Sequence, residues 1–241
     1  MSKFTFDEQT LKVLANFSSI NPSMLIEPER VSVMNVSKSV VGTFKFDTAY
    51  KFESFGLYDT ADFLSVLSAM KKSQNMSIED KDKFLLITSD NDRLTYYTTA
   101  KDMVTKVPSI DALFKDSNFE MEFSLPNDRL AIIKQMSSIL KSKYIFFETD
   151  GKRVRVTVGD ELESSTNNFE VFIETGIDIN QLSEPVKLPI VDFKILTGDY
   201  TVKIAKKVVK GKSKFFSQWK NLNGVEYLIS TEVSKWYNIH L

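Results

Sequence analysis

The chain has 241 residues, of which 42% are hydrophobic and 26% are charged, and its formal net charge is −1. It contains no cysteine and a single histidine, His240, which excludes disulfides, a histidine-based triad and a multi-histidine metal site. The near-neutral charge excludes binding of nucleic acid by bulk charge alone. No stretch approaches the ~18 uncharged apolar residues of a membrane helix, and the N-terminal sequence lacks the apolar core of a signal peptide, so we expect a cytoplasmic protein.

The first half of the chain predicts a strand, a helix, a hairpin, a second helix and a second hairpin. A short strand precedes Asp7, a candidate helix cap, and LKVLANFSSI then places Leu11, Leu14 and Phe17 on one side of an amphipathic helix. Alternating strands follow in MLIEPERVSVMNV, around a Glu-Pro-Glu-Arg turn. YDTADFLSVLSAMKK predicts the second helix, and KFLLITSDNDRLTYYTT predicts the second hairpin.

The stretch KDMVTKVPSIDALFKDSN fits neither a helix nor a hairpin pattern and predicts a connector. We place domain 1 at residues 1–107, the connector at residues 108–118 and domain 2 at residues 119–241. Both predicted domains have lengths in the usual range for a compact domain.

The second half repeats the plan of the first. LAIIKQMSSI lies 119 residues after LKVLANFSSI, and the short strand before it is displaced by the same offset. Asn127 is the candidate cap, and Leu130, Ile133, Met136 and Leu140 form the apolar side of the helix. A hairpin with an Asp-Gly turn follows, then a weaker helix pattern in VKLPIVDFKILTGD and final strands around an Asn-Gly turn. We therefore expect two tandem, similar α+β domains with much antiparallel sheet.

Four segments carry a family resemblance that spans essentially the whole chain: TLKVLANFSSIN, YDTADFLSVLS, LPIVDFKILTGDYTVKIAKK and EYLISTEV. In order and spacing they resemble the sliding clamp of tailed bacteriophages, the processivity factor of the DNA polymerase. The chain departs from that family in being richer in Lys and Phe toward the C-terminus.

The resemblance implies clamp-type domains with antiparallel sheets outside and two inner helices each, assembled head to tail as a homotrimeric ring around duplex DNA. It implies no enzymatic activity, no cofactor and no metal. The implied partners are a DNA polymerase, a clamp loader ATPase and late-transcription factors, in the cytoplasm of an infected bacterial host.

The polar sides of the predicted helices are candidates for contact with DNA. A ring that slides needs diffuse attraction to phosphates, because contacts to base edges would hold it in one place. These helix sides carry small and basic residues, and the segment from Asn127 to Lys143 has a net charge of +3. An ordinary solvated face is the alternative for each helix taken singly. The candidate DNA-facing residues are Lys12, Asn16, Lys72, Arg129, Lys134, Ser138, Lys141, Lys143 and Lys194.

Apolar residues in the connector and the tail are candidates for contact with other proteins. In the family, short hydrophobic peptides of the polymerase bind beneath the connector and near the C-terminus. The same side chains are equally suited to fastening the connector and the tail to the core. The candidate partner-binding residues are Val107, Ile110, Leu113, Phe114, Trp236, Tyr237 and Ile239.

Ring closure would pair sheet edges that a single chain leaves open. The predicted edges are residues 93–99 in the first half and residues 168–174 in the second, and both are rich in aromatic side chains. The candidate interface residues are Tyr96, Tyr97, Phe169 and Phe172.

Two questions stay open at the level of the sequence. From Tyr200 to Val225 seven lysines occur without an acid, a pattern compatible with a solvated hairpin, with phosphate contact at the ring rim or with docking of an acidic partner. The competing hypothesis for the whole chain is a non-enzymatic, ring-forming phage structural protein such as a tail component. A basic helical lining separates the two hypotheses, because a tail tube is usually lined by acidic sheet.

Overall fold

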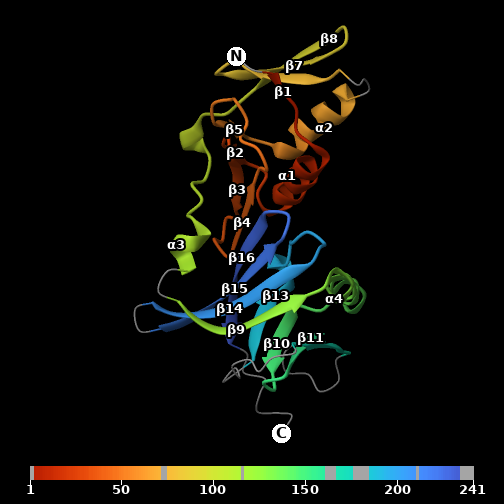
Figure 1. Ribbon diagram of the computed structural model, residues 1–241, viewed down its shortest axis with the longest axis vertical. Coiled ribbons are helices and arrows are strands. Elements are labelled where there is room, and N and C mark those ends of the chain that lie inside the picture. The colour runs from red at the N-terminus through yellow and green to blue at the C-terminus, as the bar shows by residue number, and fades with distance from the viewer. Residues whose placement is uncertain are drawn as a thin grey trace. The chain divides into compact units, whose positions relative to one another are not determined.

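The computed structural model describes residues 3–71, 75–114, 117–160, 167–175, 185–209 and 212–233. The chain divides into two compact units, residues 1–108 and 109–241. Each unit combines helices with antiparallel sheet, which confirms the predicted α+β class (Figure 1).

Among its described residues, unit 1 has two α-helices and two antiparallel sheets. The strand orders are β1-β6-β7-β8 in one sheet and β5-β2-β3-β4 in the other. The elements are β1 (Lys3–Phe4), α1 (Glu8–Ile20), β2 (Met24–Ile26), β3 (Arg30–Met34), β4 (Val40–Lys45), β5 (Phe55–Leu57), α2 (Thr60–Met70), β6 (Ser77–Asp80), β7 (Phe84–Ser89), β8 (Asp92–Tyr97) and the 3-10 turn η1 (Lys101–Met103).

Helix α1 forms where the sequence predicts it. Asp7 caps it, because its Oδ1 accepts a hydrogen bond from the Thr10 N–H at 2.6 Å. Leu14 and Phe17 are fully buried as predicted, whereas Leu11 is only half-buried. Gly42 in β4 lets the Phe17 ring approach the sheet, since a Cβ there would meet the ring at 2.9 Å. Helix α2 lies beside α1 (Figure 1).

The part of unit 2 that the structure describes has one long helix and a continuous antiparallel path of strands, β12-β11-β10-β13-β16-β15-β14-β9. The predicted Asp-Gly and Asn-Gly turns are confirmed, with φ of 92° at Gly151 and 81° at Gly224. The elements are α3 (Ile110–Phe114), β9 (Asn118–Leu125), α4 (Asn127–Leu140), β10 (Tyr144–Thr149), β11 (Arg153–Gly159), β12 (Phe169–Glu174), β13 (Val186–Pro189), the 3-10 turn η2 (Ile190–Asp192), β14 (Tyr200–Val209), β15 (Lys212–Asn221) and β16 (Val225–Val233).

Helix α4 also forms where predicted, but its cap differs. Asn127 is the first helical residue, and Pro126 before it has no side-chain acceptor. Asp199 supplies the cap from 72 residues away, since its Oδ1 accepts a hydrogen bond from the Asn127 N–H at 2.8 Å. Leu130 and Ile133 are buried as predicted, whereas the two other residues of the predicted apolar side, Met136 and Leu140, are half-buried.

The prediction of a second helix in residues 186–199 is wrong. Residues 186–189 form β13, which pairs with β10, and only the single turn η2 follows. Beyond η2, side chains bind the backbone groups that a helix would pair internally. Tyr227 Oη accepts a hydrogen bond from the Leu196 N–H at 3.2 Å, and Tyr200 Oη donates one to the Leu196 carbonyl at 3.1 Å. These bonds hold residues 193–199, which we name the stitched segment, in a non-helical conformation.

Aromatic side chains contribute to the core of each unit. In unit 1 the fully buried Phe63 of α2 packs edge-on against Tyr96, with 5.1 Å between ring centroids. In unit 2 the fully buried Trp219 packs against Phe193 of the stitched segment, with 5.2 Å between ring centroids, and Phe193 follows an Asp as Phe63 does. The two Asp-Phe dipeptides of the sequence therefore place a ring in the core of each unit, although only the first lies in a helix.

Candidate functional site

The exposed faces of α1 and α2 consist mainly of small side chains. On α1 the exposed residues follow helical spacing, and on α2 the exposed alanines and serines alternate with a single acid, Asp62. Lys12, one of the predicted DNA-facing lysines, forms an ion pair with Glu8 at 2.8 Å and lowers the pKa of the Glu8 carboxyl. The negative charge of Glu8 therefore offsets the positive charge of Lys12 on this face. The exposed residues are Glu8, Lys12, Ala15 and Ser19 on α1 and Ala61, Asp62, Ser65, Ser68 and Ala69 on α2.

Helix α4 presents a similar exposed face, with positive charge at its C-terminal end. Ala131, Gln135 and Ser138 form the middle of this face. Arg129 lies 3.9 Å from Asp128 near the start of the helix. Lys141 ends the helix in the left-handed conformation, with φ of 52°, and is exposed, as is Lys143 just beyond it in the chain. The positive charge of this helix is therefore concentrated where it ends.

Lys134 does not lie on this exposed face. Its Nζ donates a hydrogen bond to the Ile195 carbonyl and lies 5.8 Å from the centroid of the Phe193 ring. Burial lowers the pKa of the Lys134 ammonium, because desolvation disfavours the charged form. Lys134 thus anchors the stitched segment to α4, a role that helical periodicity alone gives no means of detecting.

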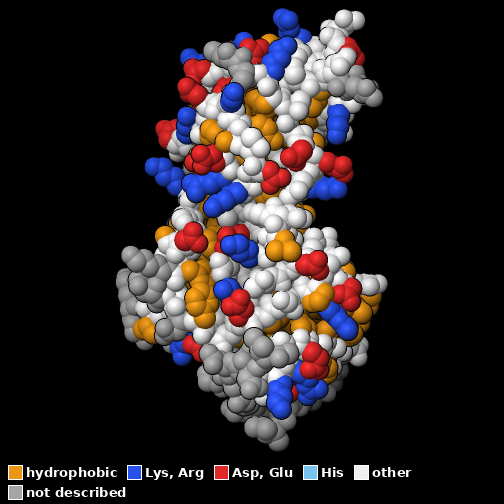
Figure 2. All heavy atoms as spheres, in the orientation of Figure 1, with side chains coloured by type: hydrophobic (Ala, Val, Ile, Leu, Met, Phe, Trp, Pro, Cys, Tyr) orange, Lys and Arg blue, Asp and Glu red, His pale blue; other side chains and the backbone are white. Residues whose placement is uncertain are grey.

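The other predicted DNA-facing residues fall in several places. Lys194 is exposed in the stitched segment, and Asn16 of α1 is half-buried. Lys72 lies outside the described residues. Lys71, which is not among the predicted residues, is exposed directly after α2. On the face shown in Figure 2, basic and acidic side chains are interspersed, as the net charge predicts.

The two predicted sheet edges are edge strands among the described residues, since β8 pairs only with β7 and β12 only with β11. Tyr97 is 76% exposed and Phe172 is 46% exposed. Tyr96 is half-buried and held within its own unit instead, because its Oη donates to the Asp59 carbonyl at 3.1 Å and its ring contacts Phe63. Phe169 is half-buried.

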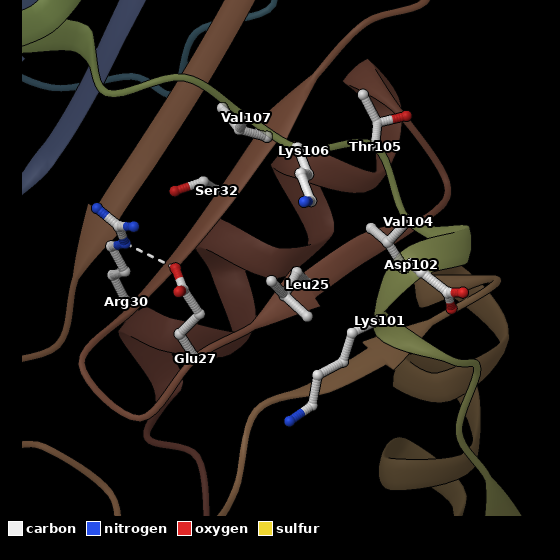
Figure 3. A pocket seen from close by; sticks show the side chains of 10 residues that line it. All are labelled: Leu25, Glu27, Arg30, Ser32, Lys101, Asp102, Val104, Thr105, Lys106 and Val107. Atoms are coloured by element: carbon white, nitrogen blue, oxygen red, sulfur yellow. Dashed lines mark hydrogen bonds and ion pairs between the residues drawn. The ribbon is translucent and has the colours of Figure 1, made fainter.

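A hollow of about 440 Å³ opens in unit 1 where the chain leaves η1 and passes over β2 and β3. Leu25, Val104 and Val107 supply apolar lining (Figure 3). The Glu27 and Arg30 side chains point toward one another at its edge and form an ion pair at 2.6 Å. The remaining lining residues are polar or charged: Ser32, Lys101, Asp102, Thr105 and Lys106.

The remaining predicted partner-binding residues lie in α3 or in the tail. Ile110 is buried, and Phe114 stacks on Phe119 with 5.7 Å between ring centroids. The Leu113 carbonyl accepts a hydrogen bond from Lys207 Nζ at 3.3 Å, which holds α3 against β14 within unit 2. Trp236, Tyr237 and Ile239 lie outside the described residues.

In the part of the chain that the structure describes, no group of three or more His, Asp or Glu side chains is placed to hold a metal ion. Within the same residues, no helix is long and apolar enough to cross a membrane.

Comparison of the fold with solved structures finds PCNA and beta-clamp chains among the matches. The PCNA of Thermococcus kodakaraensis matches with a TM-score of 0.64 and 10% identity, over 95% of this chain and 98% of that one. The PCNA of Entamoeba histolytica matches with a TM-score of 0.62 and 11% identity, over 96% and 98%. The Helicobacter pylori beta clamp, solved with a DNA ligase peptide, has a TM-score of 0.64 and 12% identity, over 100% of this chain and 70% of that one.

The chain has the sliding-clamp fold. Comparison of the sequence with protein-family models and with curated proteins finds no match. This chain therefore has the clamp fold although only about a tenth of its residues are identical to those of these structural neighbours.

Proposed function

We propose that copies of this chain join head to tail into a closed ring that encircles duplex DNA and tethers a replicative DNA polymerase. The observation that carries the proposal is the match of nearly the whole chain, both units included, to PCNA over nearly its whole length. The clamp-type exposed helix faces agree with it, because small side chains with scattered cations attract phosphates without fixing the ring to one sequence.

The ring is a homotrimer joined through β8 of one copy and β12 of the next. Both strands leave one edge without a partner among the described residues, and both expose an aromatic side chain, Tyr97 or Phe172. Adding strand to strand satisfies the open backbone groups, and a repeated head-to-tail contact closes when the rotation allows it. In solution the mass should be about three times the chain mass of 27.6 kDa.

DNA contact is assigned to the two cations at the C-terminal end of α4, Lys141 and Lys143. The test is a Lys141→Glu/Lys143→Glu variant, with Lys38→Glu/Lys83→Glu in exposed turns of unit 1 as the matched control. The first variant should keep the trimer mass but load poorly on nicked circular DNA, most of all at low salt, where phosphate attraction is least screened. Loaded wild-type ring should slide off once the circle is cut. Equal loading of the two variants would remove α4 from the DNA-facing surface, and a stable monomer would overturn the ring.

The hollow of unit 1 is proposed to take an apolar side chain of a polymerase peptide. Its apolar lining and its position beneath residues 104–107, where the chain leaves η1, support this assignment. Val107→Glu at its edge should weaken polymerase stimulation without changing the trimer mass. If stimulation persists, the peptide binds elsewhere, and a variant truncated before Trp236 tests the tail as the alternative. A clamp loader ATPase and late-transcription factors remain further proposed partners, by resemblance.

A further inference from the structure

The open strand β8 of unit 1 has one face turned into its unit and one face turned to solvent. Leu94 and Tyr96 lie opposite buried residues of β7 and are half-buried. Arg93, Thr95 and Tyr97 alternate with them and are exposed. The inner face of this edge is therefore apolar, and its outer face carries a cation at one end and an aromatic ring at the other.

The open strand β12 of unit 2 alternates in the same way. Val171 and Ile173 are buried and lie opposite buried valines of β11. Glu170, Phe172 and Glu174 are exposed on the outer face. The two edges thus match in their inner faces and carry opposite charges on their outer faces.

This alternation restricts the ways in which β8 of one copy can pair with β12 of the next. The ladders that the structure describes within each unit are antiparallel, and antiparallel pairing is slightly more stable per residue. Directly opposite residues share a face of the sheet, so the two inner faces must coincide. The longest overlaps that satisfy this condition pair residues 93–97 with residues 170–174, or residues 92–96 with residues 169–173.

The side chains on the outer face distinguish these two registers. In the first register Arg93 lies directly opposite Glu174, and opposite charges at such positions stabilise a strand pair. The exposed rings of Tyr97 and Phe172 become diagonal neighbours, about 7–8 Å apart and within reach of one another. In the second register Arg93 faces Phe172 instead, and Asp92 lies opposite a buried residue of β12. Charge and aromatic contact therefore favour the first register.

Within a single copy, Arg93 and Glu174 lack the ion pair that this register supplies. No ion pair joins either side chain to another residue in the described part of the chain. Arg153 lies opposite Glu174 in β11, but its guanidinium binds Asp150 at 3.1 Å and lies 5.2 Å from the centroid of the Phe172 ring. The Glu174 carboxylate is thus left for a cation from the next copy.

We propose that an ion pair between Arg93 of one copy and Glu174 of the next sets the register of the subunit joint. The proposal rests on the ring proposed above and adds the residue pairing by which its copies recognise one another. Pairing in this register places Leu94 beside Ile173 beneath the joint. A trimer would contain one such ion pair at each of its joints.

The first test is a charge exchange, with mass measured by light scattering over a dilution series. Arg93→Glu sets two glutamates opposite one another, and Glu174→Arg sets two arginines opposite one another. Each variant should raise the concentration at which half of the ring dissociates by about tenfold or more. Arg93→Glu/Glu174→Arg restores opposite charges and should return that concentration toward the wild-type value. Lys38→Glu, in an exposed turn, is the matched control and should behave as the wild type does.

A second exchange tests the register itself. In the proposed register Glu170 lies four residues from the position opposite Arg93, roughly 14 Å along the strand. This separation exceeds the screening length of about 8 Å at physiological salt. Arg93→Glu/Glu170→Arg should therefore remain as weak as Arg93→Glu. Rescue by the Glu170 exchange in place of the Glu174 exchange would overturn the register.

Disulfide trapping reads the same register without relying on charge. The chain has no cysteine, so an introduced pair gives no background. Arg93→Cys/Glu174→Cys should form covalent dimers and trimers with oxidised glutathione, because Cβ atoms of directly opposite residues are about 4.5–5.5 Å apart. Arg93→Cys/Glu170→Cys should stay uncrosslinked. The reverse pattern would overturn the proposal.

The mass of the wild type separates the register from the ring. A trimeric wild type whose mass is unaffected by Arg93→Glu, or whose Arg93 variant is not rescued by the Glu174 exchange, would overturn the register and leave the ring. A wild type that stays monomeric would overturn both. Circular dichroism of each variant should match the wild type, because both side chains are exposed.

Discussion

Helices α1 and α4 begin 119 residues apart and carry the same phrase, yet they are buried differently. Leu14 and its equivalent Ile133 are both buried. Ile20 is also buried, whereas its equivalent Ile139 is 61% exposed. The difference follows from the neighbours of each helix. A second long helix packs along α1, while α4 is held to the stitched segment through Lys134.

The comparison shows that a duplicated sequence pattern can form a helix in both units although the contacts that support the helix differ. In unit 1 the cap comes from the residue before the helix, and in unit 2 it comes from Asp199. Unit 2 also replaces helix packing with hydrogen bonds to a non-helical backbone, in which Lys134 and Tyr200 donate and Tyr227 accepts. Substitutions at equivalent positions of the two units measure how much each set of contacts contributes to stability.

The largest difference is expected between Ile20→Ala and Ile139→Ala. Truncating the buried Ile20 should lower the free energy of unfolding by about 2–4 kcal/mol, because it removes core contacts and leaves a cavity. Truncating the exposed Ile139 should change it by less than about 0.5 kcal/mol. Urea denaturation measures both. Similar losses would mean that Ile139 is buried against another surface of the protein.

A smaller difference is expected between Lys134→Met and Lys12→Met. Methionine keeps the apolar stem but leaves the Ile195 carbonyl without its charged donor, which should cost about 1–3 kcal/mol. Lys12 forms only an exposed ion pair, so its replacement should cost less than about 0.5 kcal/mol. Hydrogen exchange should quicken in residues 193–199 only in the Lys134 variant. Unchanged exchange there would contradict the anchoring role.

The smallest effect concerns two matching turns, Glu27–Arg30 in unit 1 and Asp150–Arg153 in unit 2. Hydrogen bonds from the Lys152 and Arg153 backbone N–H groups, with the Arg153 side chain, lower the pKa of Asp150 from 3.8 to about 2. Because the folded pKa lies below the unfolded one, the stabilisation is present above about pH 4 and is lost as the pH falls toward 2.

Acid titration measures this effect. Asp150→Asn should lose less stability between pH 4 and pH 2 than the wild type does, and carbon NMR of the Asp150 carboxyl should report the lowered pKa directly. Glu27→Gln makes the same charge change in the turn of unit 1. An ordinary pKa for Asp150 would show that the turn bonds do not persist in solution.

Local signals in the sequence predict much of this fold. Turn residues with left-handed preference locate the hairpins at Gly151 and Gly224, and the apolar spacing of Leu14 and Ile133 locates both long helices. These signals succeed because the forces behind them act between residues close in the chain.

The predictions that failed depend on distant residues. VKLPIVDFKILTGD carries apolar residues that suit a helix. Pairing of residues 186–189 with β10, and hydrogen bonds between Leu196 and the Tyr200 and Tyr227 side chains, decide its conformation instead. Lys134 appears polar and solvated on a helical projection, and only the position of Ile195 shows its role. The cap by Asp199 is likewise invisible at Asn127.

The remote cap of α4 has a consequence for the time at which this helix can form during synthesis. Helix α1 has its cap as soon as Thr10 is made, whereas α4 must wait for Asp199, 72 residues after Asn127. At roughly 5–20 residues per second, that delay is about 4–14 s on the ribosome. A short helix is marginal in water without tertiary support. Nascent unit 2 therefore passes through a period in which the apolar side of α4 is open to chaperones, and nascent unit 1 does not share this delay in capping its first helix.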